Sequence, residues 1–153
     1  MDLETKKKYE LLKIQNDKIM YEKHWKSNGL FMECIELLEN CLVLSKEESE
    51  ELFQQLQMLV PFQNGRIDWK IITNSSKMSV KDFEKSNIDK KQYYVIWDSY
   101  DVPCVYCGFR TIVNNLDDIL AVSSNTWLLS EGKDEIIEFY HEGDFIRGEI
   151  IRK

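Results

Sequence analysis

Proline and glycine are scarce in this sequence, which has two prolines and six glycines among 153 residues. Flexible linkers are rich in glycine, proline or serine, so the composition argues against a long one. No run approaches the roughly 18 apolar residues that cross a membrane, and no apolar segment follows the charged start of the chain, so we expect neither a membrane span nor a signal peptide. The four cysteines do not form the dense pattern of a small secreted domain. We therefore expect a cytoplasmic protein with reduced thiols.

Basic residues are also in the minority, and the charge is unevenly spread. The chain carries 20 basic and 27 acidic side chains, a net charge of −7. Residues 1–26 carry seven lysines and five acidic residues, whereas residues 98–153 carry five basic and eleven acidic residues. Because nucleic-acid affinity comes mainly from clustered lysine and arginine, direct binding to DNA or RNA is disfavoured. A basic protein partner fits better, and an acidic surface that only keeps the protein soluble is the alternative.

The hydrophobic pattern predicts helices in the first part of the chain. A mostly polar helix is expected over residues 4–26, with Tyr9, Leu12 and Ile19 on one stripe. After an interruption at residues 27–29, a second helix carries apolar residues at helical spacing as far as Cys41. A third helix begins at Ser45, where a serine followed three residues later by a glutamate matches a capping box, and it ends before residue 61, a proline.

Strands are expected to dominate the rest of the chain. Residues 93–97 have no polar alternation, which is typical of a central strand covered on both faces. Further strands are expected at 67–71, 103–106, 121–129, 135–141 and 145–151, and short helical segments at 79–84 and 111–120. This order predicts an α+β fold in which N-terminal helices pack on one face of a mostly antiparallel C-terminal sheet. We expect a single domain over residues 1–153, with a helical part (1–60) and a β-rich part (61–153).

The cysteines and histidines offer weak candidates for chemistry. Cys104 and Cys107 form a C-x-x-C pair, which can ligate zinc or act as a redox couple, but a strand would place them on opposite sides of the sheet. Cys34 and Cys41 are seven residues apart, so a helix would put them on one face, two turns apart. Burial as small side chains is the simpler interpretation, and we expect no cofactor or metal. His141 could act as a general base, or be structural.

Acidic and aromatic residues near the strand ends are the candidate partner-binding set. Asp98 and Asp101 lie in a turn-like stretch, and Asp117 and Asp118 lie in or beside a short helix. Turn and capping roles explain such aspartates without any function, but exposed carboxylates also suit a basic partner. Tyr100 lies in the same polar turn and is the aromatic residue that we most expect at an interface. The other late aromatics are expected to be core.

Four stretches of the second half resemble a group of small bacterial immunity proteins. These stretches are Trp97-Asp98-Ser99-Tyr100-Asp101-Val102-Pro103, Leu116-Asp117-Asp118-Ile119-Leu120-Ala121-Val122, Asn125-Thr126-Trp127-Leu128-Leu129 and Ile137-Glu138-Phe139-Tyr140-His141-Glu142-Gly143. The resemblance covers roughly residues 93–150, and the group neutralises polymorphic toxins of the contact-dependent and LXG types. It implies an immunity protein that binds the C-terminal domain of a cognate toxin tightly, without chemistry of its own. It assigns no role to any residue.

The sequence therefore leaves three candidate functions. The first is an immunity protein that blocks the active-site cleft of a toxin, which is expected to be a nuclease with a basic cleft. The second is a small enzyme, similar to a hydrolase, that would need Asp98, Asp101 and His141 to converge in one pocket. The third is a general protein-interaction adaptor that docks through the helical part. The sequence leaves the oligomeric state open.

Overall fold

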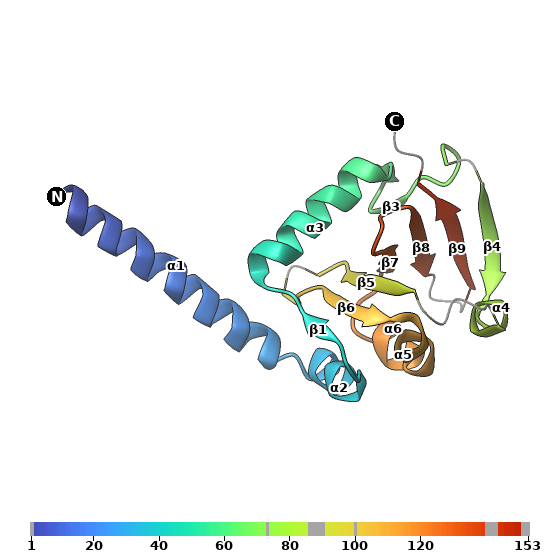
Figure 1. The fold of residues 1–153 in the computed structure, drawn as a ribbon, viewed down its shortest axis with the longest axis horizontal. Coiled ribbons are helices and arrows are strands. Elements are labelled where there is room, and N and C mark those ends of the chain that lie inside the picture. The colour runs from blue at the N-terminus through green and yellow to red at the C-terminus, as the bar shows by residue number, and fades with distance from the viewer. Residues whose placement is uncertain (1, 73, 86–90, 100, 140–143, 151–153) are drawn as a thin grey trace.

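The computed structural model describes residues 2–72, 74–85, 91–99, 101–139 and 144–150 (Figure 1). The helices are α1 (Leu3–Lys26), α2 (Gly29–Leu37), α3 (Lys46–Leu59), α4 (Val80–Lys85), α5 (Phe109–Asn114) and α6 (Leu116–Leu120). The strands are β1 (Leu42–Val43), β2 (Phe62–Gln63), β3 (Arg66–Ile67), β4 (Ser75–Ser79), β5 (Gln92–Trp97), β6 (Val105–Gly108), β7 (Thr126–Ser130), β8 (Glu135–Phe139) and β9 (Asp144–Glu149). No helix among these residues is long and apolar enough to span a membrane.

A seven-stranded sheet with the order β1-β6-β5-β7-β8-β9-β4 organises the molecule. Every pairing within it is antiparallel, and β2 and β3 form a separate two-stranded ribbon. β5 lies third in the order and is apolar on both sides, as its sequence predicts. The α+β class and the antiparallel sheet are therefore confirmed.

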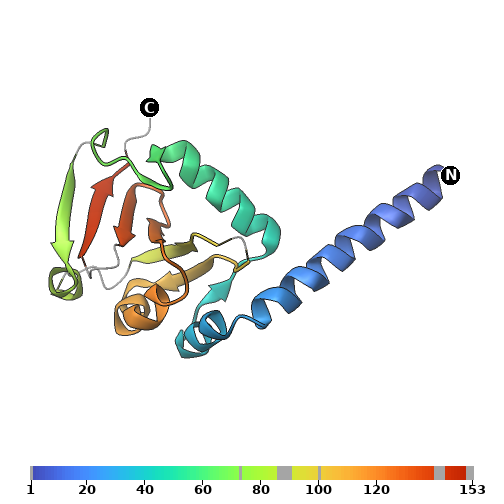
Figure 2. The same ribbon diagram turned by 180° about the vertical axis from the view of Figure 1, so that it is seen from behind.

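Helices cover both faces of the sheet, so the expectation that they share one face is wrong. On one face α2, α5 and α6 pack through Phe31, Phe109 and Ile119 against alternate residues of the strands, such as Val95 and Ile137. On the other face α3 packs through buried leucines against Ile96, Trp127 and Ile136. Figures 1 and 2 show α3 above the sheet and the three shorter helices below it. Two faces are needed because the central strands are apolar on both sides.

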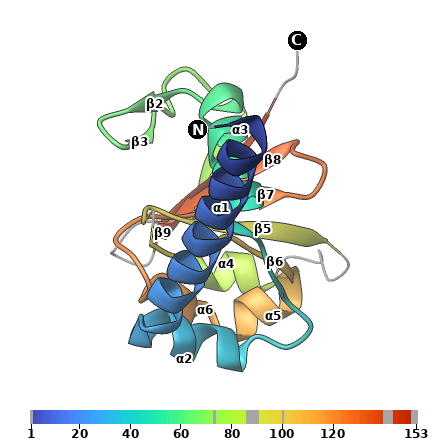
Figure 3. The ribbon, with the colours of Figure 1, turned by 90° about the vertical axis from the view of Figure 1, so that its left-hand side faces the viewer.

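Most of the first helix packs on neither face. Its N-cap Asp2 accepts a hydrogen bond from the Thr5 backbone N–H at 2.8 Å, and no residue of α1 is buried. Trp25, near its C-terminal end, contacts Phe31 edge to face with ring centroids 5.6 Å apart. The helix then runs outward from α2, past the α3 side of the molecule (Figures 1 and 3). Only the C-terminal part of α1 therefore contacts the rest of the protein.

Several element boundaries differ from the sequence-based expectations. α2 ends at Leu37, four residues before Cys41, and Asn40 then adopts a left-handed φ of 58°, which asparagine tolerates. The strand expected at 67–71 is limited to the end of the β2–β3 ribbon, and the helix expected at 111–120 is divided at Asn115. The edge strands β1 and β4 were not expected. β1 has two residues and β4 is largely exposed, so neither shows the apolar alternation that reveals a strand.

A buried carboxylate fastens the β2–β3 ribbon to the sheet. Glu138 on β8 accepts hydrogen bonds from the Ile67 backbone N–H at 2.9 Å and from the indole N–H groups of Trp69 at 3.0 Å and Trp127 at 2.8 Å. These three donors satisfy the carboxylate, which is only 1% exposed. On the opposite face Glu135 accepts from the Tyr93 hydroxyl at 2.9 Å and pairs with Lys91 and Arg147.

Candidate functional site

A cleft of about 550 Å³ lies where the C-terminal part of α1 meets α3 and the end of β5. One wall is Tyr21 of α1, and the other is the exposed edge of α3 with Lys46, Glu50 and Phe53. Trp97, Val102 and Cys104 form the buried floor, and Asp98 lies on the lip. We call this the α1–α3 cleft. It brings together segments that are far apart in the sequence.

Asp98 is held in place at the lip by the chain that leads into β7. Its backbone N–H donates to the Asn125 carbonyl at 3.1 Å, and its carbonyl accepts from the Ser123 hydroxyl at 3.1 Å. The Asn125 amide also donates to the Asp98 carboxylate at 3.1 Å. The carboxylate is exposed, so its position is fixed while its charge faces solvent.

Asp101 lies a few residues further along the same loop and contacts α1. Its carboxylate is 3.2 Å from His24 Nε2, and both side chains are mostly exposed. This contact links the loop after β5 to the base of α1. Because the pair is exposed, its contribution to stability is small, and the carboxylate stays open to a partner.

Ser49, a buried residue of α3, connects the wall of the cleft to its floor. Its hydroxyl accepts from the Cys104 backbone N–H at 3.0 Å and bonds the Tyr21 hydroxyl. Burial raises the pKa of Tyr21 to about 12, and burial likewise raises the pKa of the Cys104 thiol to about 12. Both groups are therefore neutral near pH 7, and the thiol is not an activated nucleophile. An apolar floor with an acidic lip suits binding of a protein side chain rather than covalent chemistry.

The two pairs of predicted aspartates do not share this cleft. Asp117 and Asp118 lie in the first turn of α6, on the face of the sheet opposite α3. The Asp118 charge adds to burial in raising the pKa of the Cys34 thiol to about 12, which places this aspartate beside α2. The Trp97 indole N–H donates to the Ile119 carbonyl at 2.8 Å, so α6 is tethered to the end of β5.

Two of the sequence candidates, Tyr100 and His141, lie outside the described residues. The convergence of Asp98, Asp101 and His141 that an enzyme would need is therefore not part of the described structure. Among the residues that the structure does describe, no group of three or more histidine, cysteine, aspartate or glutamate side chains could hold a metal ion.

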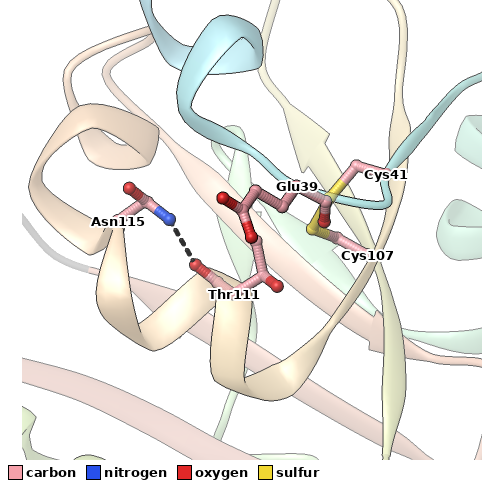
Figure 4. The surroundings of a disulfide bond; sticks show 5 residues. All are labelled: Glu39, Cys41, Cys107, Thr111 and Asn115. Carbon is pink, nitrogen blue, oxygen red and sulfur yellow. Dashed lines mark hydrogen bonds between the residues drawn. A yellow bond between two sulfur atoms is a disulfide. The ribbon is translucent and has the colours of Figure 1, made fainter.

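The cysteines correct one expectation. Cys41 and Cys107 form a disulfide, with Cα atoms 4.7 Å apart (Figure 4), so the expectation of reduced thiols is wrong for this pair. The register explains the pairing, because β1 pairs Leu42 with Tyr106, and the next pair outward brings Cys41 opposite Cys107. Seeing this from the sequence would have required recognising β1.

Of the two remaining predictions for the cysteines, one is confirmed and one is wrong. Cys104 and Cys107 are both buried, and they belong to the cores on opposite faces of the sheet, as their spacing on a strand predicts. Cys34 and Cys41 do not share a helix face, because α2 ends before Cys41. Cys34 and Cys104 are free thiols.

Sequence reasoning missed the helical walls of the cleft. Ser49 belongs to the buried stripe of α3 and Phe53 lies four residues after it, a spacing that could have identified them. Tyr21 carried no local signal, because it reaches the cleft only through the packing of α1 against α2.

One comparison with known proteins gives a family. A family model described as "CdiI immunity protein EcoliA0-like" matches residues 28–148. The match begins at the N-cap of α2 and reaches into β9, the last strand, so among the helices that the structure describes only α1 lies outside it. No curated protein matches the chain.

Proposed function

Because the chain belongs to the CdiI immunity protein family, whose model covers residues 28–148, we propose that it neutralises its toxin by covering the toxin's active-site cleft. Family membership makes it an immunity protein that binds a toxin. The proposal adds that the toxin domain is a nuclease, that neutralisation needs no chemistry from this chain, and that it happens in the cytoplasm. The charge of the α1–α3 cleft is the observation that carries the proposal.

The lip of the cleft gathers exposed carboxylates around a buried apolar floor. Glu50 and Asp98 line it, and Asp101 lies on the same loop. Lys46, at the start of α3, also lines the cleft, so with Asp101 the three carboxylates leave a net negative charge at the lip. A nuclease presents basic side chains to the phosphates of its substrate, so fixed carboxylates can occupy those positions in place of nucleic acid. The apolar floor would receive one side chain of the toxin as an anchor.

Asp117 and Asp118 form a second acidic patch, on α6, and we propose it as a secondary contact. Tyr100 lies between Asp98 and Asp101 in the sequence, and we propose it as an aromatic contact with the toxin. The two patches make separate predictions, because each can be neutralised without touching the other.

The experiment measures association with the cognate toxin domain over a series of salt concentrations. The test variant is Glu50→Gln, Asp98→Asn and Asp101→Asn, in which each amide keeps an oxygen acceptor while the charge is lost. Charges that steer association act over about 8 Å at physiological salt and about 3 Å at 1 M. The association rate of the wild type should therefore fall steeply with salt, and that of the variant should be lower and flatter.

A matched control is Glu149→Gln, which removes an exposed charge on β9, away from the cleft. It should leave the rate and its salt dependence close to those of the wild type. A second arm, Asp117→Asn with Asp118→Asn, tests the α6 patch. If the α6 variant controls the rate and the cleft variant does not, the toxin docks on the other face. Rates that do not respond to salt in any variant would mean that the acidic surface serves solubility only.

A further inference from the structure

α1 is the part of the molecule that the proposed function leaves unexplained. It has 24 residues, a length of about 36 Å, and every residue from 3 to 20 is exposed. The exposed residues include large apolar side chains, among them Leu11 (66% exposed) and Ile14 (52% exposed). Helices in proteins gain most of their stability from packing. We therefore expect a projecting helix with exposed leucines and isoleucines to pack against another surface.

The positive charge of α1 limits which surfaces can cover it. α1 carries seven lysines and four acidic residues, a net charge of +3. A basic toxin cleft would repel it, and two α1 helices side by side would repel each other. Apolar side chains also occur around the whole circumference of α1, with Leu12 and Ile19 on one side and Leu11 and Ile14 on the other. A helix that lies on a membrane surface needs one apolar face and one polar face instead.

One surface that complements α1 belongs to α2. Residues 27–45 contain three glutamates and no basic residue, a net charge of −3. On α2, Leu30 (52% exposed) and Leu37 (49% exposed) lie seven residues apart on the outward face, with Glu33 between them. Glu36 borders this stripe. We call Leu30, Glu33, Glu36 and Leu37 the α2 outer face.

One stripe of α1 complements the α2 outer face in the sign of its charge and in its exposed apolar side chains. Lys7, Leu11, Ile14 and Lys18 recur at intervals of four, three and four residues, so two apolar side chains are flanked by two lysines. The same stripe continues to Tyr21 and Trp25, which contact the protein's own α3 and α2. The stripe therefore faces the body at its base and solvent further out.

We propose that two copies of the chain form a symmetric dimer in which the α1 stripe of each copy docks on the α2 outer face of the other. A twofold axis midway between the two surfaces brings both contacts together, so each apolar and ionic contact is made twice. The exposed leucines of α2 and the apolar residues of α1 cover one another, and the lysines that flank the α1 stripe face the acidic side of α2. The family match that begins at residue 28 fits α1 as an addition that serves assembly.

The test is the mass of the purified full chain, without toxin, by sedimentation over a dilution series. The wild type should dimerise, and Leu11→Glu with Ile14→Glu should raise the dimer dissociation constant by more than about tenfold. The matched control, Leu12→Glu with Ile19→Glu, makes the same change of charge on the other side of α1 and should leave the constant within about threefold of the wild type.

A charge exchange sharpens the test. Lys7→Glu with Lys18→Glu should weaken the dimer, and adding Glu33→Lys and Glu36→Lys to the same chain should restore it. A wild type that stays monomeric over the whole series overturns the proposal, and so does a dimer that the Leu11 and Ile14 substitutions leave intact. Because no toxin is present, these outcomes are independent of the proposed function. If the wild type is monomeric and the Leu11 and Ile14 substitutions weaken toxin binding, then α1 docks on the toxin and not on a second copy.

Discussion

α1 buries none of its apolar residues, whereas the body of the protein, residues 28–148, buries most of its own. In the body, isoleucines such as Ile137 are fully buried between the sheet and its helices, whereas Ile14 of α1 is 52% exposed. The body carries the family match and an acidic charge, and α1 is basic and lies outside the match. The difference teaches that residue type alone does not locate a core, because burial requires a partner surface that the sequence of one element does not specify.

The largest effect should come from the one covalent link within the body. The Cys41–Cys107 disulfide closes a loop with a sequence separation of 66 residues. Such a loop restricts the unfolded chain, so reducing the bond should lower the free energy of unfolding by about 4 kcal/mol. Urea unfolding with and without dithiothreitol measures this. A Cys104→Ala variant should show the same loss on reduction, because Cys104 is not in the bond.

A pair of isoleucine substitutions compares the two regions directly. Ile137→Ala should lower the free energy of unfolding by about 2–5 kcal/mol, because it leaves a cavity in a close-packed core. Ile14→Ala should change it by less than about 0.5 kcal/mol at concentrations where the chain is monomeric. Urea unfolding of both variants is the measurement. Equal effects would mean that α1 is packed on the body in solution, contrary to its exposure.

The hydrogen bonds to Glu138 should matter less than the core but more than a surface charge. Glu138→Gln keeps one oxygen acceptor but turns an amide NH₂ toward one of the N–H donors, so we expect a loss of about 2 kcal/mol. Trp69 and Trp127 fluorescence during urea unfolding reports the site. The exposed Glu149→Gln should have almost no effect, and a similar effect of both would show that the buried bonds add nothing.

The smallest effect should be the response of the body to alkali. The pKa of Cys104 is raised from 9.0 to about 12 by burial, so the folded state keeps the thiol neutral. A group whose folded pKa is raised stabilises the fold fully below its unfolded pKa and loses that contribution as pH rises toward the folded pKa. At pH 10 the loss is about 1.4 kcal/mol. Unfolding at pH 8 and pH 10 should therefore differ less in Cys104→Ala than in the wild type, and equal differences would contradict the assigned burial.

Elements with strong local signals could be predicted from the sequence. Both hydrogen bonds of the α3 capping box form, between Ser45 and Glu48, and β5 is a central strand because every residue in its core is apolar. The early end of α2 could not be predicted, because it depends on the left-handed turn at Asn40 and on β1 joining the sheet. The one-domain organisation over residues 1–153 stays a prediction.

The candidate site could be predicted only in part. Asp98 lines the cleft and Asp101 lies on the same loop because the strand before them ends there, and a polar turn after a buried strand is visible in the sequence. Their separation from Asp117 and Asp118 was not visible, because it depends on α6 lying on the face opposite α3. Tyr21 and Phe53 joined the site through contacts between helices, which local patterns do not encode.

The most direct test of the account is amide hydrogen exchange of the full chain with and without its cognate toxin domain. An interface at the α1–α3 cleft predicts slower exchange in α3 and in residues 97–104 when the toxin is bound, with no change in β4, at the far edge of the sheet. Residues 3–20 should exchange at the same rate with and without the toxin, provided that the two samples contain the same concentration of dimer. Protection confined to residues 3–20, with α3 and residues 97–104 unchanged, would contradict the assignment of the body as the toxin-binding region.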